Sequence, residues 1–297
     1  MLPEYLAPAV DVVVNTIVPV FAVIGVGWLL ASRGGVDLRT LSDLALMVTS
    51  PALLFSVLAG TTLVSSRWLV LSGGTLWMVA GTAALAWVYV RAAGLSRGAL
   101  LPCVFFNGGN MGLACSRLAF GEAGLEAGAI IFVSIALLTS FFGIWIAKGE
   151  NGIGEALRMP LLYGSAGGLG MALTGTELPR VVMEPIEMLG AMAIPLMLIN
   201  LGVQLRTLEI RDVQHALGTV AIRMIGGFAC TWGFVTVLGI DGLDRQVLLL
   251  YSVMPAAVIN AVLAQRYDSS PALVASSIVL GTLASLVAIP AVLLYVG

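Results

Sequence analysis

The sequence predicts an all-α integral membrane protein, because it is strongly apolar and its apolar residues fall into long runs. Hydrophobic residues make up 59% of the 297 residues and charged residues 10%, and the mean hydropathy is +1.04. Soluble domains are roughly 45–50% apolar and about 25% charged. A helix needs about 20 apolar residues to span the hydrocarbon core of a bilayer. Ten stretches meet this requirement: 10–32, 41–63, 68–90, 98–120, 123–147, 155–174, 184–205, 214–238, 244–265 and 271–296.

The first stretch, 10–32, is expected to be a retained span. Glu4 and Asp11 precede or begin it, and no Lys or Arg stands before it, whereas a secretory signal peptide starts with basic residues.

The distribution of Lys and Arg predicts the orientation, since basic residues concentrate in cytoplasmic loops. One set of alternate loops holds nine of them: Arg33, Arg39, Arg91, Arg97, Lys148, Arg158, Arg206, Arg211 and Arg266. The opposite set holds Arg67, Arg117, Arg180 and Arg245. Both termini are therefore expected outside, in the plasma (inner) membrane of a bacterium. The short loops carry no basic surface for nucleic acid.

The ten spans divide into two groups of five, residues 1–150 and 151–297. Leu95-Ser96-Arg97 before the fourth span resembles Leu243-Asp244-Arg245 before the ninth, and Pro51 in the second span matches Pro195 in the seventh. Because each half has an odd number of spans, the second half enters the membrane from the opposite side. The sequence thus predicts a 5+5 inverted repeat, an organisation typical of secondary transporters, whose sites lie between the repeats near the midplane.

The fourth and ninth spans are interrupted. Helix-breaking and polar residues stand at mid-length in both: Asn107-Gly108-Gly109-Asn110 in 98–120, and Met254-Pro255 with Asn260 just beyond in 244–265. Hydrocarbon cannot satisfy the backbone groups that a break frees, so breaks persist only where they face protein or a watery cavity. We expect the second half-helices to restart near Met111 and at Pro255, a residue suited to a helix's first position.

These breaks predict a binding site for an anion, because free N–H groups at helix N-termini carry partial positive charge. Asn107 and Asn110 can donate to a carboxylate or bind the freed backbone groups, and Gly108 and Gly109 allow close approach of a ligand. The alternative is that the asparagines only satisfy the broken backbone.

Other polar residues lie in apolar surroundings. Asn260, Asn200 and Ser50 are candidates for lining the site, with interhelical hydrogen bonding as the equal alternative. Arg223 lies within the eighth span, where snorkelling to the headgroups is favoured over a functional role. The predicted substrate-binding set is Asn107, Gly108, Gly109, Asn110, Pro255, Asn260, Asn200 and Ser50.

No Asp or Glu lies in the middle of a predicted span. Ion-coupled carriers commonly use such a carboxylate, so uniport is favoured over a sodium- or proton-coupled symporter of the same fold. Export of an anion is helped by the membrane potential, by about 2.3 kcal/mol per charge per 100 mV. One histidine and no HExxH motif argue against an enzyme or a metal site. No cofactor is expected, and a channel stays open as a reading.

Two segments resemble the crossover regions of the auxin efflux carrier family. These are Phe106-Asn107-Gly108-Gly109-Asn110-Met111-Gly112-Leu113 and Met254-Pro255-Ala256-Ala257 through Val262-Leu263-Ala264-Gln265-Arg266-Tyr267. The family resembles bile acid sodium symporters in fold, with scaffold and transport domains and an elevator-like movement. The resemblance implies that Asn107, Asn110 and Pro255 surround a bound carboxylate, and that the protein forms a homodimer through its scaffold side. The sequence does not distinguish aliphatic dicarboxylates from aromatic acids such as an auxin.

Overall fold

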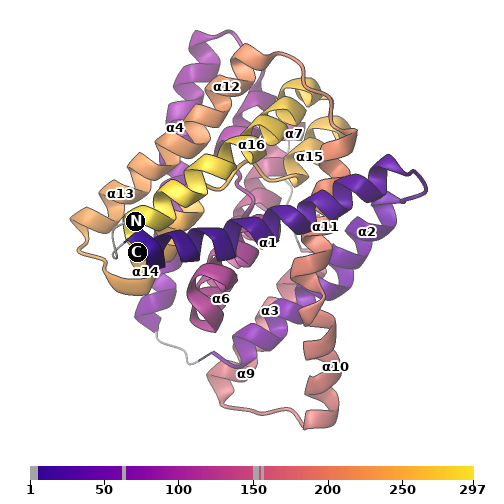
Figure 1. Ribbon diagram of the computed structural model, residues 1–297, viewed down its shortest axis with the longest axis vertical. Coiled ribbons are helices and arrows are strands. Elements are labelled where there is room, and N and C mark those ends of the chain that lie inside the picture. Colours follow the sequence, from indigo (N-terminus) through magenta and orange to yellow (C-terminus); the bar gives the residue numbers. More distant parts are fainter. Residues whose placement is uncertain (1–5, 62–64, 150–153, 155–156) are drawn as a thin grey trace.

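The computed structural model describes residues 6–61, 65–149, 154 and 157–297, and their regular structure is helical (Figure 1). The helices of the first part of the chain are α1 (Leu6–Ser32), α2 (Leu38–Leu44), α3 (Ser50–Ala59), α4 (Ser65–Ala92), α5 (Leu101–Val104), α6 (Ala114–Leu138) and α7 (Ile144–Lys148). Those of the second part are α9 (Pro160–Thr174), α10 (Arg180–Ala191), α11 (Ala193–Thr207), α12 (Val213–Ala221), α13 (Gly227–Val237), α14 (Gly242–Ser252), α15 (Ile259–Arg266) and α16 (Pro271–Val296).

Short π-helical or 3₁₀ segments join several of these helices. They are η1 (Ala45–Thr49), η2 (Arg97–Leu100), η3 (Gly108–Leu113), η4 (Thr139–Gly143) and η5 (Ile222–Gly226). The α2–η1–α3 segment runs on as one helix, and its hydrogen bonding widens just before Pro51, the residue that lacks an N–H donor. The α10–α11 segment is likewise irregular at Met192, just before Pro195.

Seven helical segments in the described residues are long and apolar enough to cross a bilayer, which confirms an α-helical membrane protein. They are Val13–Ser32, Leu38–Ala59, Ser66–Ala92, Gly108–Lys148, Arg180–Thr207, Val213–Val237 and Pro271–Val296. The longest of them bends at Gly121, whose φ of 67° and ψ of −155° lie outside the helical region. The total of ten spans and the inverted repeat stay predictions, and the expected boundary at residue 150 lies outside the described residues.

Close helix packing divides the molecule into two groups. In one, α1 lies along α11, and α3 packs against α9 and α10. Backbones touch there: a Cβ at Gly27 would lie 2.1 Å from the carbonyl oxygen of Ile199, and one at Gly202 would lie 2.0 Å from that of Ile24. Small residues at such contacts let membrane helices approach closely.

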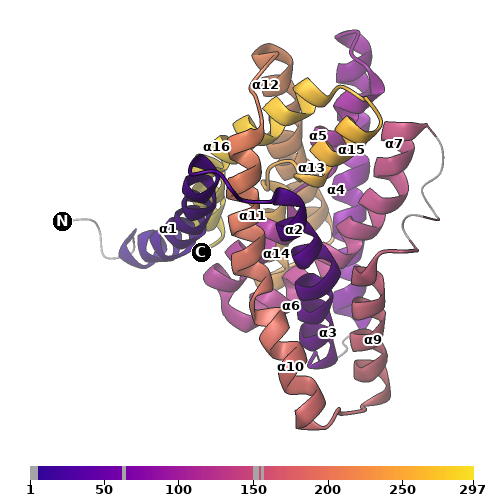
Figure 2. The same ribbon diagram turned by 90° about the vertical axis from the view of Figure 1, so that its right-hand side faces the viewer.

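In the second group, α4, α12, α13 and α16 pack around the two interrupted helices, which consist of α5 with η3–α6 and of α14 with α15. Both views show α3, α9 and α10 together at one end of the molecule and α4 and α12 reaching the other (Figures 1 and 2). The groups meet where α1 contacts α6 and α16, and where α11 contacts η3. The interrupted helices therefore lie beside the boundary between the groups.

Candidate functional site: the crossing of two interrupted helices

The first interruption follows the short helix α5. Phe105 ends that helix in an extended conformation, with φ of −99° and ψ of 110°. Asn107 then forms a tight turn, since its φ of −77° and ψ of 70° are those of an inverse γ-turn and the Gly108 N–H donates to the Phe106 carbonyl at 2.9 Å. Helical structure resumes at Gly108, three residues earlier than Met111.

The second interruption lies between α14, which ends at Ser252, and α15, which begins at Ile259. The expectation that Pro255 starts the second half-helix is wrong. Pro255 lies in the connecting stretch, where its carbonyl accepts a hydrogen bond of 2.8 Å from the Asn107 N–H. The pairing of the two interrupted segments holds this stretch extended and delays the restart of the helix.

Both interruptions cross as a short antiparallel pair, with a bridge between Phe106 and Ala256. The Ala257 N–H donates to the Phe105 carbonyl at 2.9 Å, and the Asn260 side-chain Nδ2 donates to the same carbonyl at 2.8 Å. Backbone groups freed by the two breaks thus satisfy one another, as a low-dielectric interior requires. The breaks expected from the sequence are present, and they lie in contact.

The asparagines at the crossing satisfy backbone groups freed by the breaks, and each of Asn107 and Asn260 also keeps a polar atom that a ligand could bind. Asn107 accepts a hydrogen bond from the Asn110 N–H on Oδ1 at 3.1 Å, a typical N-cap, but its Nδ2 is buried without a hydrogen-bond partner among the described residues. Asn260 donates from Nδ2 to the Phe105 carbonyl, and its buried Oδ1 has no partner in the described part of the chain. The two residues are 4% and 0% exposed. Buried polar atoms are nearly always paired. Bonding to the backbone accounts for Oδ1 of Asn107 and Nδ2 of Asn260, but not for the other polar atom of each side chain.

Asn110, the third amide, is half-buried and is the third residue of η3. No hydrogen bond from its side chain is found within the described part of the chain. The glycines before it are packed: a Cβ at Gly108 would lie 2.9 Å from Cγ2 of Ile135, and one at Gly109 would lie 2.8 Å from the ring of Phe132. The sequence GGN therefore brings the turn of η3 directly against α6.

Asn200 and Ser50 make other contacts. Asn200 on α11 pairs with the Ser42 hydroxyl on α2 at 3.3 Å, and Ser50 donates to the Ala45 carbonyl of its own helical segment. Among the described residues, no hydrogen bond joins either of them to the crossing. The alternative reading, hydrogen bonding within and between helices, accounts for both.

The structure places Arg223 differently from the expectation drawn from the sequence. It does not snorkel: it is 1% exposed, and of the residues whose burial is described it is the one fully buried charged side chain. Its guanidinium donates to the carbonyls of Cys103 at 3.4 Å, Val104 at 3.2 Å and Ser252 at 3.2 Å. These carbonyls end α5 and α14. The sequence did contain one indication of this burial: Gly227, one turn further along the helix, has no side chain and so leaves room for the long side chain of Arg223.

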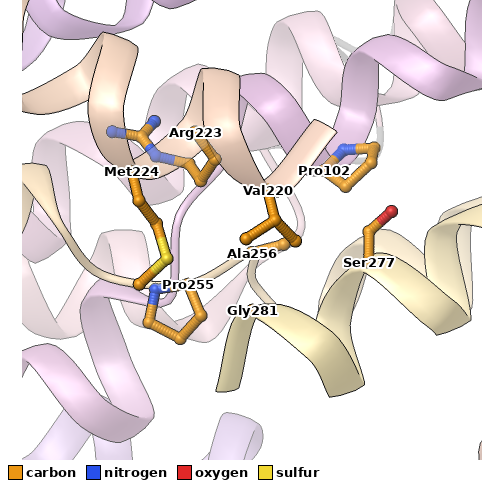
Figure 3. A pocket seen from close by; sticks show the side chains of 8 residues that line it. All are labelled: Pro102, Val220, Arg223, Met224, Pro255, Ala256, Ser277 and Gly281. Atoms are coloured by element: carbon orange, nitrogen blue, oxygen red, sulfur yellow. The ribbon is translucent and has the colours of Figure 1, made fainter. Parts of the chain in front are cut away.

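A recess lies beside Arg223 on the side of the crossing that faces α16 (Figure 3). Its walls come from four segments, and the lining residues are Pro102, Val220, Arg223, Met224, Pro255, Ala256, Ser277 and Gly281. The recess is too narrow for a water molecule. The unpaired asparagine atoms, rather than this recess, therefore define the candidate site.

The described residues include no group of three or more His, Cys, Asp or Glu side chains arranged to hold a metal ion. What the crossing offers instead is amide groups and two helix N-termini, η3–α6 and α15. Amide N–H groups and N-terminal backbone N–H groups are donors suited to an anion.

Comparisons with known proteins identify the kind of protein. The family described as "membrane transport protein" matches residues 152–295. An uncharacterized transporter of Methanothermobacter thermautotrophicus is 28% identical over 295 residues, which cover 93% of this chain and 96% of that protein. An uncharacterized transporter of Methanocaldococcus jannaschii is 27% identical over 203 residues, 65% of this chain and 66% of that protein. These matches support a membrane transporter, and the family match covers the second half of the chain, where the second of the two crossover segments lies.

Proposed function

We propose that this transporter moves a small organic acid anion across the plasma membrane, and that the carboxylate binds at the crossing of the two interrupted helices. The observation that carries the proposal is the buried Nδ2 of Asn107, which lies at the N-terminus of η3 and has no hydrogen-bond partner in the part of the chain that the structure describes. Its Nδ2 donor and the adjoining backbone N–H groups form a positive end without a counter-charge.

Asn110 and Asn260 complete the proposed site. Asn110 is half-buried and lies beside the contact of η3 with α11, so that its amide is within reach of a solute arriving between the two helix groups. The Oδ1 of Asn260 has no partner among the residues that the structure describes and can accept from a hydroxyl group or a protonated acid. Gly108, Gly109 and Pro255 shape the backbone around these amides, whereas Asn200 and Ser50 belong to helix contacts.

We further propose that transport is uniport by an elevator-like movement of the group containing the crossing against the group containing α1, α3 and α11. Asn107 and Asn260 are 4% and 0% exposed, so binding of a solute at their amides and its release require the helices to move. No buried carboxylate is found among the residues whose burial is described, which leaves no obvious relay for a proton. This proposal also includes export as the direction of transport and an inner-membrane location in bacteria. It further includes both termini outside the cell and a homodimer.

The test is a flux screen with purified protein in proteoliposomes. Monocarboxylates, dicarboxylates and indole acids are supplied with and without sodium and pH gradients. We expect saturable flux of at least one acid that needs neither gradient. Strict dependence on sodium or on a proton gradient would favour a symporter, flux without saturation would favour a channel, and a preference for cations would overturn the proposed site.

A further inference from the structure

The guanidinium of Arg223 lies at the carboxyl ends of both interrupted helices. Helix α5 ends at Val104 and α14 ends at Ser252, and Arg223 donates to carbonyls from both ends. The last carbonyls of a helix have no partner within the helix and carry a partial negative charge. One cationic side chain therefore bridges two negative helix ends.

No carboxylate lies within ion-pair distance of Arg223 in the described part of the chain. The Phe106 ring packs against it, with the guanidinium carbon 5.2 Å from the ring centroid, in the geometry of a cation–π contact. A buried charge inside a membrane protein is costly unless it is compensated. Here the compensation comes from helix ends and a ring, which are neutral groups.

Helix ends of this kind have a known chemistry in membrane transporters. Where helices are discontinuous, unwound carbonyls and half-helix carboxyl ends are typical ligands of a coupling cation. We propose that Arg223 is a resident cation: its guanidinium occupies the place at the carboxyl ends of α5 and α14 where an alkali cation would otherwise bind. The crossing then holds its geometry without a cation from solution.

Gly227 is the positioning residue that makes this arrangement possible. It follows Arg223 by one helical turn, and a Cβ there would lie 2.3 Å from Nη2 of Arg223 and 2.6 Å from the Ser252 carbonyl oxygen. A side chain at residue 227 would therefore displace the guanidinium from α14. In the same helix, a Cβ at Gly233 would meet nothing within 4 Å, so Gly233→Ala is a matched control.

The first experiment measures thermal unfolding of the full chain in detergent, in sodium, potassium and choline chloride at equal ionic strength. The key pair is Arg223→Gln, which removes the charge, and Arg223→Lys, which keeps it; the control is Arg206→Gln, at an exposed residue near Trp28. We expect the unfolding temperature of the wild type, of Arg223→Lys and of the control to be the same in all three salts. Arg223→Gln should unfold earlier in choline and recover in sodium or with millimolar guanidinium.

Several results would overturn the resident cation. The first is a wild-type unfolding temperature that sodium raises. The second is an Arg223→Gln variant with the same lowered unfolding temperature in every salt, and the third is the same salt dependence in the Gln and Lys variants. Gly227→Ala gives a second route, because it keeps the arginine but moves it. The unfolding temperature of Gly227→Ala should depend on the cation in the salt, whereas that of Gly233→Ala should not. The same dependence in both variants would also contradict the proposal.

The functional arm rests on the proposed transport of an acid and uses an acid that the wild type carries. Without sodium, Arg223→Gln should lose about tenfold or more of the flux, since hydrogen bonds to a charged group are commonly worth that factor, and sodium should restore it. If the wild type carries no acid, the proposed function fails while the unfolding experiment still decides the role of Arg223. If the wild type carries an acid and Arg223→Gln ignores cations, the resident cation fails and the transport function stands.

Discussion

Replacing Asn107 with serine separates the two roles of this residue at the crossing. The Asn107 Oδ1 caps η3 by accepting from the Asn110 N–H, and serine is about as good an N-cap as asparagine. The Nδ2 donor, which has no partner among residues 6–61, 65–149, 154 and 157–297, is lost in the variant. The change therefore keeps the cap and removes the group proposed to bind the carboxylate.

The expected loss of binding follows from the single donor removed. A hydrogen bond to a charged group contributes about 1.5–3 kcal/mol, and each 1.4 kcal/mol is a factor of ten in affinity. Asn107→Ser should thus weaken acid binding by roughly ten- to a hundredfold. The unfolding temperature should stay close to that of the wild type, because Nδ2 makes no hydrogen bond to the described residues that the substitution would remove.

Asn107→Asp tests the sign of the ligand's charge at the same atoms. Two unit charges 4 Å apart repel by about 4 kcal/mol at an effective dielectric constant of 20, which is about a thousandfold in affinity. The aspartate variant should therefore bind an acid much more weakly than the serine variant.

Binding is measured by titration calorimetry in detergent and transport by flux into proteoliposomes, with an acid that the wild type carries. Asn15→Ser, at an exposed residue of α1, is the matched control and should leave both unchanged. If Asn107→Ser binds the acid as tightly as the wild type, Nδ2 is not part of the site. If Asn107→Asp binds it as well as Asn107→Ser does, the ligand carries no negative charge at this position.

Two glycine substitutions test the packing that holds the crossing in place. Gly202→Ala puts a Cβ 2.0 Å from the Ile24 carbonyl oxygen, so it should destabilise the contact of α11 with α1 by about 1–3 kcal/mol or more and lower the unfolding temperature. Gly25→Ala, with open space around its Cβ, should leave that temperature unchanged, and equal effects would contradict the packing argument. Gly109→Ala puts a Cβ 2.8 Å from the Phe132 ring and should reduce acid flux several-fold more than Gly25→Ala. Wild-type flux in that variant would show that the turn of η3 tolerates displacement.

The positions of the two breaks could be predicted from the sequence because their causes are local. Glycines and asparagines disfavour the helix interior, and proline lacks a donor, so the Asn107–Asn110 run and Pro255 reveal the interruptions wherever the spans lie. The restart of the second half-helix could not be predicted in the same way. It depends on the hydrogen bond between Asn107 and Pro255, which joins two parts of the chain far apart in the sequence.

The role of Arg223 was missed for a related reason. An arginine two turns inside a helix reads as snorkelling when the neighbours of that helix are unknown. Its real partners are carbonyls on α5 and α14, which become available only because both helices are interrupted. The hydrogen-bond partners of Arg223 thus depend on breaks in two other spans, and Gly227 is the one nearby residue in the sequence that indicates its burial.

Together, the two proposals place a positive side chain at the carboxyl ends of the interrupted helices and an anion site at their amino ends. The carboxyl ends of the interrupted helices face the guanidinium of Arg223, and the amino ends lie at unpaired amides. If the crossing moves as the proposed elevator, it carries a charge of +1 when empty and is neutral when it holds a monovalent acid. The membrane potential then acts on the empty step, by about 2.3 kcal/mol per charge per 100 mV. A negative interior draws the empty crossing inward, where it loads again. Export of an acid can therefore be driven by the return of the empty carrier, with no coupling ion to load.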